Sequence, residues 1–208
     1  MSGARDRPAE RAARLLAGLV LFGLSLALLV KAGLGLDPWT VLSEGVSLRT
    51  GLSLGQVTIL SSVALLLVWV PLRQRPGPGT VANALIVGPV LDLGVWLIPA
   101  PHALAGQIAM LVAAILGTAI ATGLYVGAGW GPGPRDGLMT GLAALGVPVA
   151  AARTAIELSV LAAGWALGGT VGVATALFAA SIGPLVATAM PRLVLRSPRR
   201  CSDATAAV

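Results

Sequence analysis

The residue most suggestive of chemistry is Asp92, an acid inside the apolar run from Val81 to Ile98. An ionised carboxylate within a membrane helix is energetically expensive, so such a residue usually marks an ion or proton pathway and has a partner nearby. The alternative is a carboxylate close enough to the outer end of the helix to be solvated and paired with Lys31 or Arg49. The sequence leaves both interpretations open.

Two short segments hold further charged candidates. The first runs from Asp37 to Arg49 and contains Glu44, and its Asp-Pro start predicts an N-cap followed by proline at the first helical position. The second runs from Gly133 to Gly146 and carries Arg135 and Asp136 directly after the corresponding proline. Each segment predicts a helix of about three turns, which is too short to cross a membrane.

Two arrangements of these short helices are compatible with the sequence. In one, the helices enter the protein from opposite faces and direct their positive N-terminal ends at a central cavity, where a broken helix can hold an ion or an anionic group. In the other, they lie flat in the membrane interface. The first short helix would then have Trp39, Leu42 and Val46 in lipid and Glu44 and Arg49 in water.

Two further polar residues lie in apolar runs. Glu157 follows Arg153 by four residues, a spacing that lets the side chains meet on one helix face, and a structural ion pair is the favoured interpretation. Asn83 is a candidate for a hydrogen bond between helices. Nine residues, or roughly half a turn of helical phase, separate Asn83 from Asp92, so no common site is expected for them.

The sequence contains no pattern typical of enzymatic or metal chemistry. It has no HExxH or GxSxG motif and no histidine within an apolar run. The single histidine, His102, and the single cysteine, Cys201, fall in different predicted compartments, so no metal site is expected. No catalytic residue and no cofactor are predicted, and an intramembrane enzyme is the least favoured class.

Composition indicates a membrane protein. Of the 208 residues, 56% are hydrophobic and only 11% are charged, and the mean hydropathy is +0.90. A water-soluble core cannot absorb that much apolar surface. Six apolar runs approach the length of about 20 residues that a span requires, so we predict an all-α bundle of six transmembrane helices. The runs are Leu15 to Val30, Val57 to Leu72, Val81 to Ile98, Leu104 to Val126, Ala151 to Leu167 and Val171 to Met190.

The chain contains a duplication. VKAGLGLDPWTVLSE begins at Val30, and VGAGWGPGPRDGLMT begins 96 residues later at Val126. Each copy has three predicted spans and one short helix. A unit with an odd number of spans re-enters the membrane upside down, so a pseudo-two-fold axis in the membrane plane is expected. The chain is thereby divided into a basic tail at 1–14, repeats at 15–98 and 103–190, and a basic tail at 191–208 that is expected to be disordered.

Charge asymmetry gives the predicted orientation. With the N-terminus in the cytoplasm, the inner side receives twelve arginines and the outer side only Lys31 and Arg49. Both termini are therefore expected to be cytoplasmic. Contact of the basic tails with anionic lipid headgroups explains the net charge of +6, and no nucleic-acid partner is expected.

Several short motifs resemble those of a known family. The Gly-Leu-Gly run at 33–35, the Pro38-Trp39 pair, the Thr-Gly-Leu-Ser run at 50–53 and the pattern G-T-x-x-N-A-L-x-x-G-x-x-x-D ending at Asp92 are similar to elements of the bacterial YczE/YyaS/YitT membrane-protein family. The family commonly has Asp after the Pro-Trp pair, where this chain has Thr40. The resemblance covers most of the chain and implies a multi-pass protein of the bacterial plasma membrane. It implies no activity, because the family's own activity is largely undefined.

Two functions stand as hypotheses. An inverted repeat with short helices and a buried acid predicts a transporter or channel for a small solute or ion, by analogy of architecture. The alternative is a noncatalytic accessory or scaffold subunit that docks to another membrane protein, to a biosynthetic assembly or to further copies of itself, because few polar residues line any pathway. Whether Asp92 faces the bundle interior or the lipid headgroups discriminates between them.

Overall fold

The computed structural model describes residues 8–193, and all regular secondary structure in that range is helical. The predicted all-α fold is confirmed. A long helix, a short helix, an intermediate helix and a long helix follow one another, and the same order then recurs. The helices are α1 (Pro8–Ala32), α2 (Pro38–Thr50), α3 (Leu54–Trp69), α4 (Pro78–Leu97), α5 (Leu104–Gly127), α6 (Pro134–Ala144), α7 (Val149–Ala166) and α8 (Val173–Leu193).

The helix bounds differ from the predicted runs by a few residues, most at the start of α1. This helix begins at Pro8, within the range predicted as a tail. An ion pair four residues apart, from Arg14 Nη2 to Glu10 Oε1 at 2.9 Å, supports the additional turns. At the other end, α8 continues to Leu193. The rest of both predicted tails, including Cys201, lies outside the described residues.

Four helices in the described range, α1, α4, α5 and α8, are long and apolar enough to cross a membrane. The α2–α3 pair, which is bent by 113°, becomes a fifth candidate when it is counted as one broken segment. Length and composition thus support a multi-pass membrane protein.

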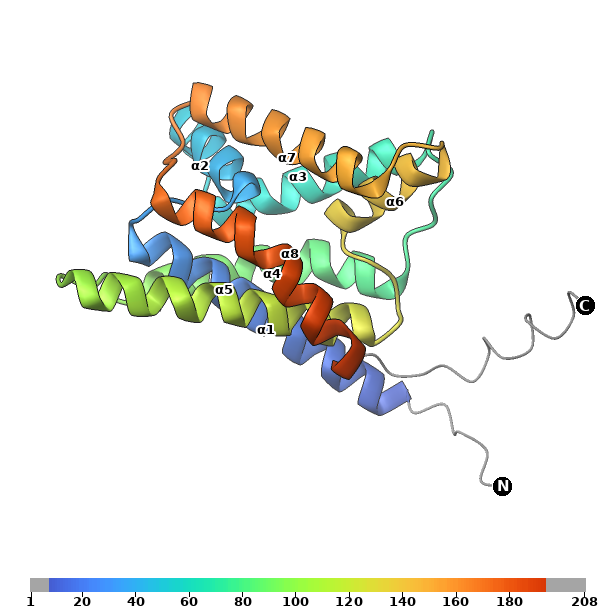
Figure 1. Cartoon of the computed structure of the whole chain (residues 1–208), viewed down its shortest axis with the longest axis horizontal. Helices are drawn as coiled ribbons and strands as arrows, with labels where there is room; N and C mark the ends of the chain where they lie inside the picture. The colour runs from blue at the N-terminus through green and yellow to red at the C-terminus, as the bar shows by residue number, and fades with distance from the viewer. Residues whose placement is uncertain (1–7, 194–208) are drawn as a thin grey trace, which may run out of the picture.

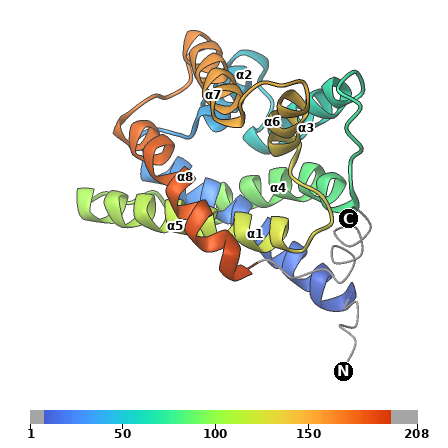
Figure 2. The same ribbon diagram turned by 45° about the vertical axis from the view of Figure 1, so that its right-hand side comes forward.

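The long helices α1, α4, α5 and α8 lie on one side of the molecule, and the shorter helices α2, α3, α6 and α7 lie on the other (Figures 1 and 2). On the long side, α1 packs against α5, α4 against α1, and α8 against α5. On the short side, α2 packs against α7 and α3 against α6. Each short helix is therefore held by the intermediate helix of the other half.

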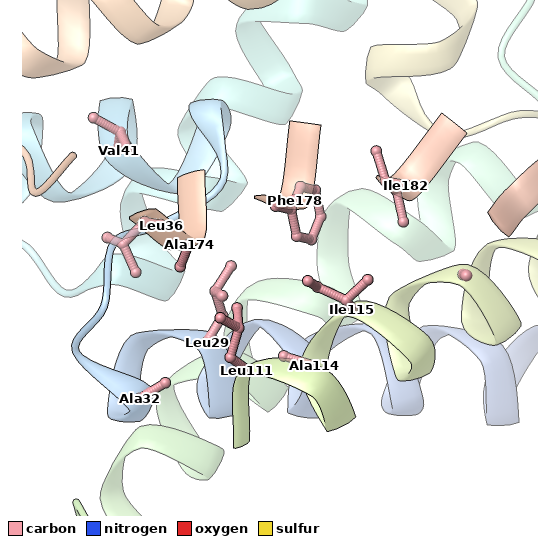
Figure 3. Packing of buried hydrophobic residues seen from close by; sticks show 11 residues of the cluster. Leu29, Ala32, Leu36, Val41, Leu111, Ala114, Ile115, Ala174, Phe178 and Ile182 are labelled. Carbon is pink, nitrogen blue, oxygen red and sulfur yellow. The ribbon is translucent and has the colours of Figure 1, made fainter. Parts of the chain in front are cut away.

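Apolar side chains fill the junction of α1, α5 and α8 (Figure 3). Phe178 and Ile182 of α8 point towards Ile115 of α5, and Leu29 of α1 is completely buried beside them. Lipid tails are as apolar as these side chains, so this junction stabilises the bundle through close van der Waals packing.

The chain leaves both α1 and α5 through a pair of glycines with positive φ angles. The angles are +67° and +115° at Gly33 and Gly35, and +74° and +115° at Gly129 and Gly131. Glycine adopts this left-handed region without steric cost. Space is also restricted, because a Cβ atom on Gly131 would lie 2.7 Å from Thr80 Oγ1.

Each of these breaks is closed by the other half of the chain. The Leu34 carbonyl accepts a hydrogen bond from the Ala174 N–H at the start of α8, with an N–O distance of 3.0 Å. The Trp130 carbonyl accepts one from the Gly79 N–H at the start of α4, at 2.9 Å. Backbone groups freed inside a membrane protein must be paired within the protein, so these crossed bonds hold both breaks in place.

Substitution of Gly131 tests the importance of this backbone conformation. We expect Gly131→Ala to lower the free energy of unfolding by about 1–3 kcal/mol, because alanine at positive φ is strained. Gly183→Ala is the matched control: it lies in α8, an added Cβ there meets no atom within 4 Å, and alanine is the better helix former. Thermal unfolding in detergent, followed by tryptophan fluorescence, measures both. Equal losses in the two variants would show that the left-handed turn is unimportant.

Candidate functional site

A cavity of about 360 Å³ lies at the centre of the bundle, and residues from all eight helices line it. Five of the lining residues carry ionisable charge. They are Asp37, Arg135, Asp136, Arg153 and Glu157.

Arg135 connects the two short helices across this cavity. Its Nη1 lies 3.6 Å from Asp37 Oδ2, and its guanidinium lies over the Trp39 ring, 5.0 Å from the ring centroid. The next residue, Asp136, accepts a hydrogen bond from the Tyr125 hydroxyl at 2.6 Å. These contacts join polar side chains at the start of α2, on α5 and at the start of α6.

Local sequence fixes the ends of the two short helices at the cavity. Asp37 is the N-cap of α2 as predicted, and its Oδ2 accepts the Thr40 N–H at 3.4 Å. At the start of α6, the Pro134 carbonyl accepts a hydrogen bond from the buried Trp69 indole at 3.0 Å. Each N-terminal end also carries its own carboxylate, Asp37 on α2 and Asp136 in the first turn of α6.

The residues at the N-terminal ends of both short helices line this cavity. In the interfacial alternative Trp39 would lie in lipid, whereas here it is only 8% exposed and forms part of the cavity wall. Glu44, which that alternative assigns to water, is half-buried and accepts the Thr170 N–H at 2.5 Å. It ties α2 to the segment before α8 and does not line the cavity.

Three further polar residues, Arg153 and Glu157 of α7 and Asn83 of α4, line the cavity. Arg153 Nε donates to Glu157 Oε1 at 3.0 Å, which is the ion pair expected from their spacing, and both residues also line the cavity. Asn83 lines it from α4 and is largely buried.

Asp92 lies apart from this cluster. Its Oδ2 accepts the Ser53 hydroxyl at 2.5 Å and its Oδ1 accepts the Gly55 N–H at 2.7 Å. Ser53 is the N-cap of α3, so the carboxylate of Asp92 caps the N-terminus of a neighbouring helix. It is half-buried and forms no ion pair with Lys31 or Arg49 in the described part of the chain. Its surroundings are those of a structural acid, and it does not line the cavity.

Two residues of the cavity give little signal in the sequence. Tyr125 could have been singled out as the only tyrosine of the chain. Thr118 lies inside an apolar helix, where a threonine usually bonds a carbonyl of the preceding turn. Among the described residues, Thr118 Oγ1 and Asp37 Oδ1 are buried side-chain oxygens that have no hydrogen-bond partner.

Comparison with known proteins identifies the family. Residues 9–191 match the model of a family of unknown function, DUF6198. The chain belongs to the DUF6198 family. This DUF6198 protein is 39% identical to an uncharacterised protein of Haemophilus influenzae over 173 residues, which cover 83% of this chain and 79% of that protein.

The second relative confirms the resemblance that the motifs indicated. The uncharacterised membrane protein YczE of Bacillus subtilis is 32% identical to this DUF6198 protein over 197 residues, which cover 92% and 91% of the two chains. No solved structure matches the chain.

The capping role of Asp92 in this DUF6198 protein can be tested by truncation. We expect Asp92→Ala to lower the free energy of unfolding by about 1–3 kcal/mol, because two hydrogen bonds to the start of α3 are lost. Leu93→Ala, at an exposed position of the same helix, should have a smaller effect. Thermal unfolding measures both. An Asp92→Ala protein as stable as the parent would contradict the capping role.

Proposed function

We propose that this protein is a transporter of a small solute in the plasma membrane, and that the central cavity is its substrate site. One observation carries the proposal: the N-terminal ends of two short helices, one from each half, meet at the same cavity. Interrupted helices that meet between repeats form the substrate sites of many secondary transporters. Charged side chains inside a membrane bundle are expensive, and a role in binding or translocation explains their presence.

Matching positions of the two halves line this cavity, which supports an inverted repeat of six spans. With a spacing of 96 residues, and of 95 after the short helices, every lining residue of the first half has a lining counterpart in the second half, which also contributes lining residues of its own. These pairs include Phe22 with Thr118, Leu26 with Thr122, Trp39 with Arg135, Thr58 with Arg153, Ser62 with Glu157, Asn83 with Phe178 and Val87 with Ile182. A cavity on a pseudo-two-fold axis would have this property.

The paired positions differ in charge. Arg135, Arg153 and Glu157 belong to the second half, and their counterparts Trp39, Thr58 and Ser62 are uncharged. The first half supplies Asp37 in return, opposite Gly133. The positions that line the cavity thus support two-fold symmetry. The charges at these positions do not follow that symmetry, because the two halves carry different side chains.

The proposed mechanism is alternating access by rocking of one half against the other. The halves meet along α1 and α5, where Gly18 and Gly117 allow close approach of the two helices. The start of α1 and the end of α8 lie together, since Arg14 Nη1 donates to the Leu193 carbonyl at 3.3 Å. We assign this end to the cytoplasm because the arginines of the sequence are concentrated there.

Cysteine accessibility tests the proposal against the accessory-subunit alternative. In a Cys201→Ser background, which removes the only cysteine, we expect Thr118→Cys to react with a small membrane-impermeant thiol reagent in both right-side-out and inside-out vesicles. The matched control is Ala114→Cys, one turn earlier on α5 in the apolar junction of α1, α5 and α8, which should stay unreactive. Reaction of Thr118→Cys from one face only, or from neither, would contradict alternating access and favour an accessory subunit.

A further inference from the structure

We propose that the solute is a small organic ammonium ion, a protonated alkylamine, whose N–H groups are held at Asp37 and Thr118. This inference rests on the proposed function and names the substrate class of the same cavity.

The first argument is the charge of the cavity. Three carboxylates and two guanidinium groups line it, which leaves one net negative charge among the described residues. In the described part of the chain, Arg135 forms an ion pair with Asp37 and Arg153 forms one with Glu157, whereas Asp136 accepts a hydrogen bond from the neutral Tyr125 hydroxyl. An uncompensated charge inside a membrane protein is costly, so a monovalent cation is the complementary ligand.

The second argument is the presence of free acceptors. Asp37 is 2% exposed and Thr118 is 3% exposed, yet Asp37 Oδ1 and Thr118 Oγ1 have no hydrogen-bond partner among the described residues. Both residues line the cavity, one from the first half and one from the second. Buried polar atoms are almost always paired, and a donor from a ligand would satisfy both. An ammonium group supplies several N–H donors and a positive charge together.

The helix ends argue against an anionic ligand. The positive end of a helix dipole ordinarily attracts an anion. Here Asp37 caps α2 and Asp136 lies in the first turn of α6, so each end already has a carboxylate of its own. The sequence left open whether these ends hold an ion or an anionic group, and the side chains at the ends disfavour an anionic ligand.

The cavity wall on α8 indicates an apolar body for the ligand. Four apolar side chains at successive four-residue spacings line it, namely Phe178, Ile182, Val186 and Met190. The volume of about 360 Å³ falls at the low end of small-molecule sites, which span about 300–1,000 Å³. In the described range, no group of three or more His, Cys, Asp or Glu side chains could hold a metal ion. An alkylammonium ion therefore fits better than a bare inorganic cation.

Binding of butylammonium to the full-length protein in phosphatidylcholine nanodiscs tests the inference. We expect saturable stabilisation against heat and a saturable change in tryptophan fluorescence, because Trp39 is in the cavity wall. Butanol, tetramethylammonium and sodium, each at matched concentration, should have no such effect, since the first lacks the charge and the others lack N–H donors.

Two variants locate the binding to the proposed atoms. Asp37→Asn should weaken butylammonium binding at least tenfold while still capping α2, because asparagine is an equally good N-cap. Thr118→Val should weaken it several-fold without changing any charge. The control is Glu44→Gln, which removes an acid of the same helix outside the cavity and should leave the affinity unchanged.

The possible outcomes separate this inference from the proposed function. If sodium or tetramethylammonium binds as well as butylammonium, or if Asp37→Asn binds normally, the ammonium site is wrong. If butylammonium does not bind although Thr118→Cys reacts from both faces, the substrate class is wrong and the transporter stands. If butylammonium binds but Thr118→Cys reacts from one face only, the ammonium site stands and transport is contradicted.

Discussion

The arrangement at the centre of the molecule depends on hydrogen bonds to backbone groups at two breaks, where the chain leaves α1 and α5. Water does not pair such groups in hydrocarbon, so a break is possible only where the protein supplies partners. Leu34 and Trp130 present carbonyls at the two breaks, and the first turns of α8 and α4 donate to them. Because each donor belongs to the other half, both breaks depend on contacts between the halves.

Charged side chains next to the two breaks, Asp37 and Arg135, line the cavity and form an ion pair there. Asp37 serves α2 as a cap through one carboxylate oxygen and approaches Arg135 with the same oxygen, which leaves the other without a partner among the described residues. Arg135 in turn lies between Asp37 and the face of Trp39. A cation–π contact in a desolvated setting adds about 2 kcal/mol to the placement of such a guanidinium.

Local signals in the sequence predicted the elements better than the site. The order Asp37-Pro38 was sufficient to predict the start of α2, because N-capping depends on neighbouring residues only. Hydropathy also located the long helices to within a few residues. It could not show that Asp92 contacts the start of α3, that Tyr125 contacts the start of α6, or that Thr118 lines the cavity, because these placements depend on the packing of helices distant in the chain. The sequence alignment of the two halves pairs Trp39 with Arg135, but it does not show that the two side chains are in contact, as they are in the structure.

The unequal charges of matching positions have an evolutionary consequence. A duplicated unit that inserts in both orientations could begin as a homodimer of one half, with identical side chains facing the shared axis. Two copies of the first half would place a pair of Asp37 carboxylates at the cavity with no arginine, whereas two copies of the second would contribute equal numbers of acids and guanidinium groups and lack Asp37 altogether. Neither symmetric dimer reproduces a single excess negative charge. In the proposed inverted repeat, the two halves therefore contribute different charges to the cavity and do not substitute for each other.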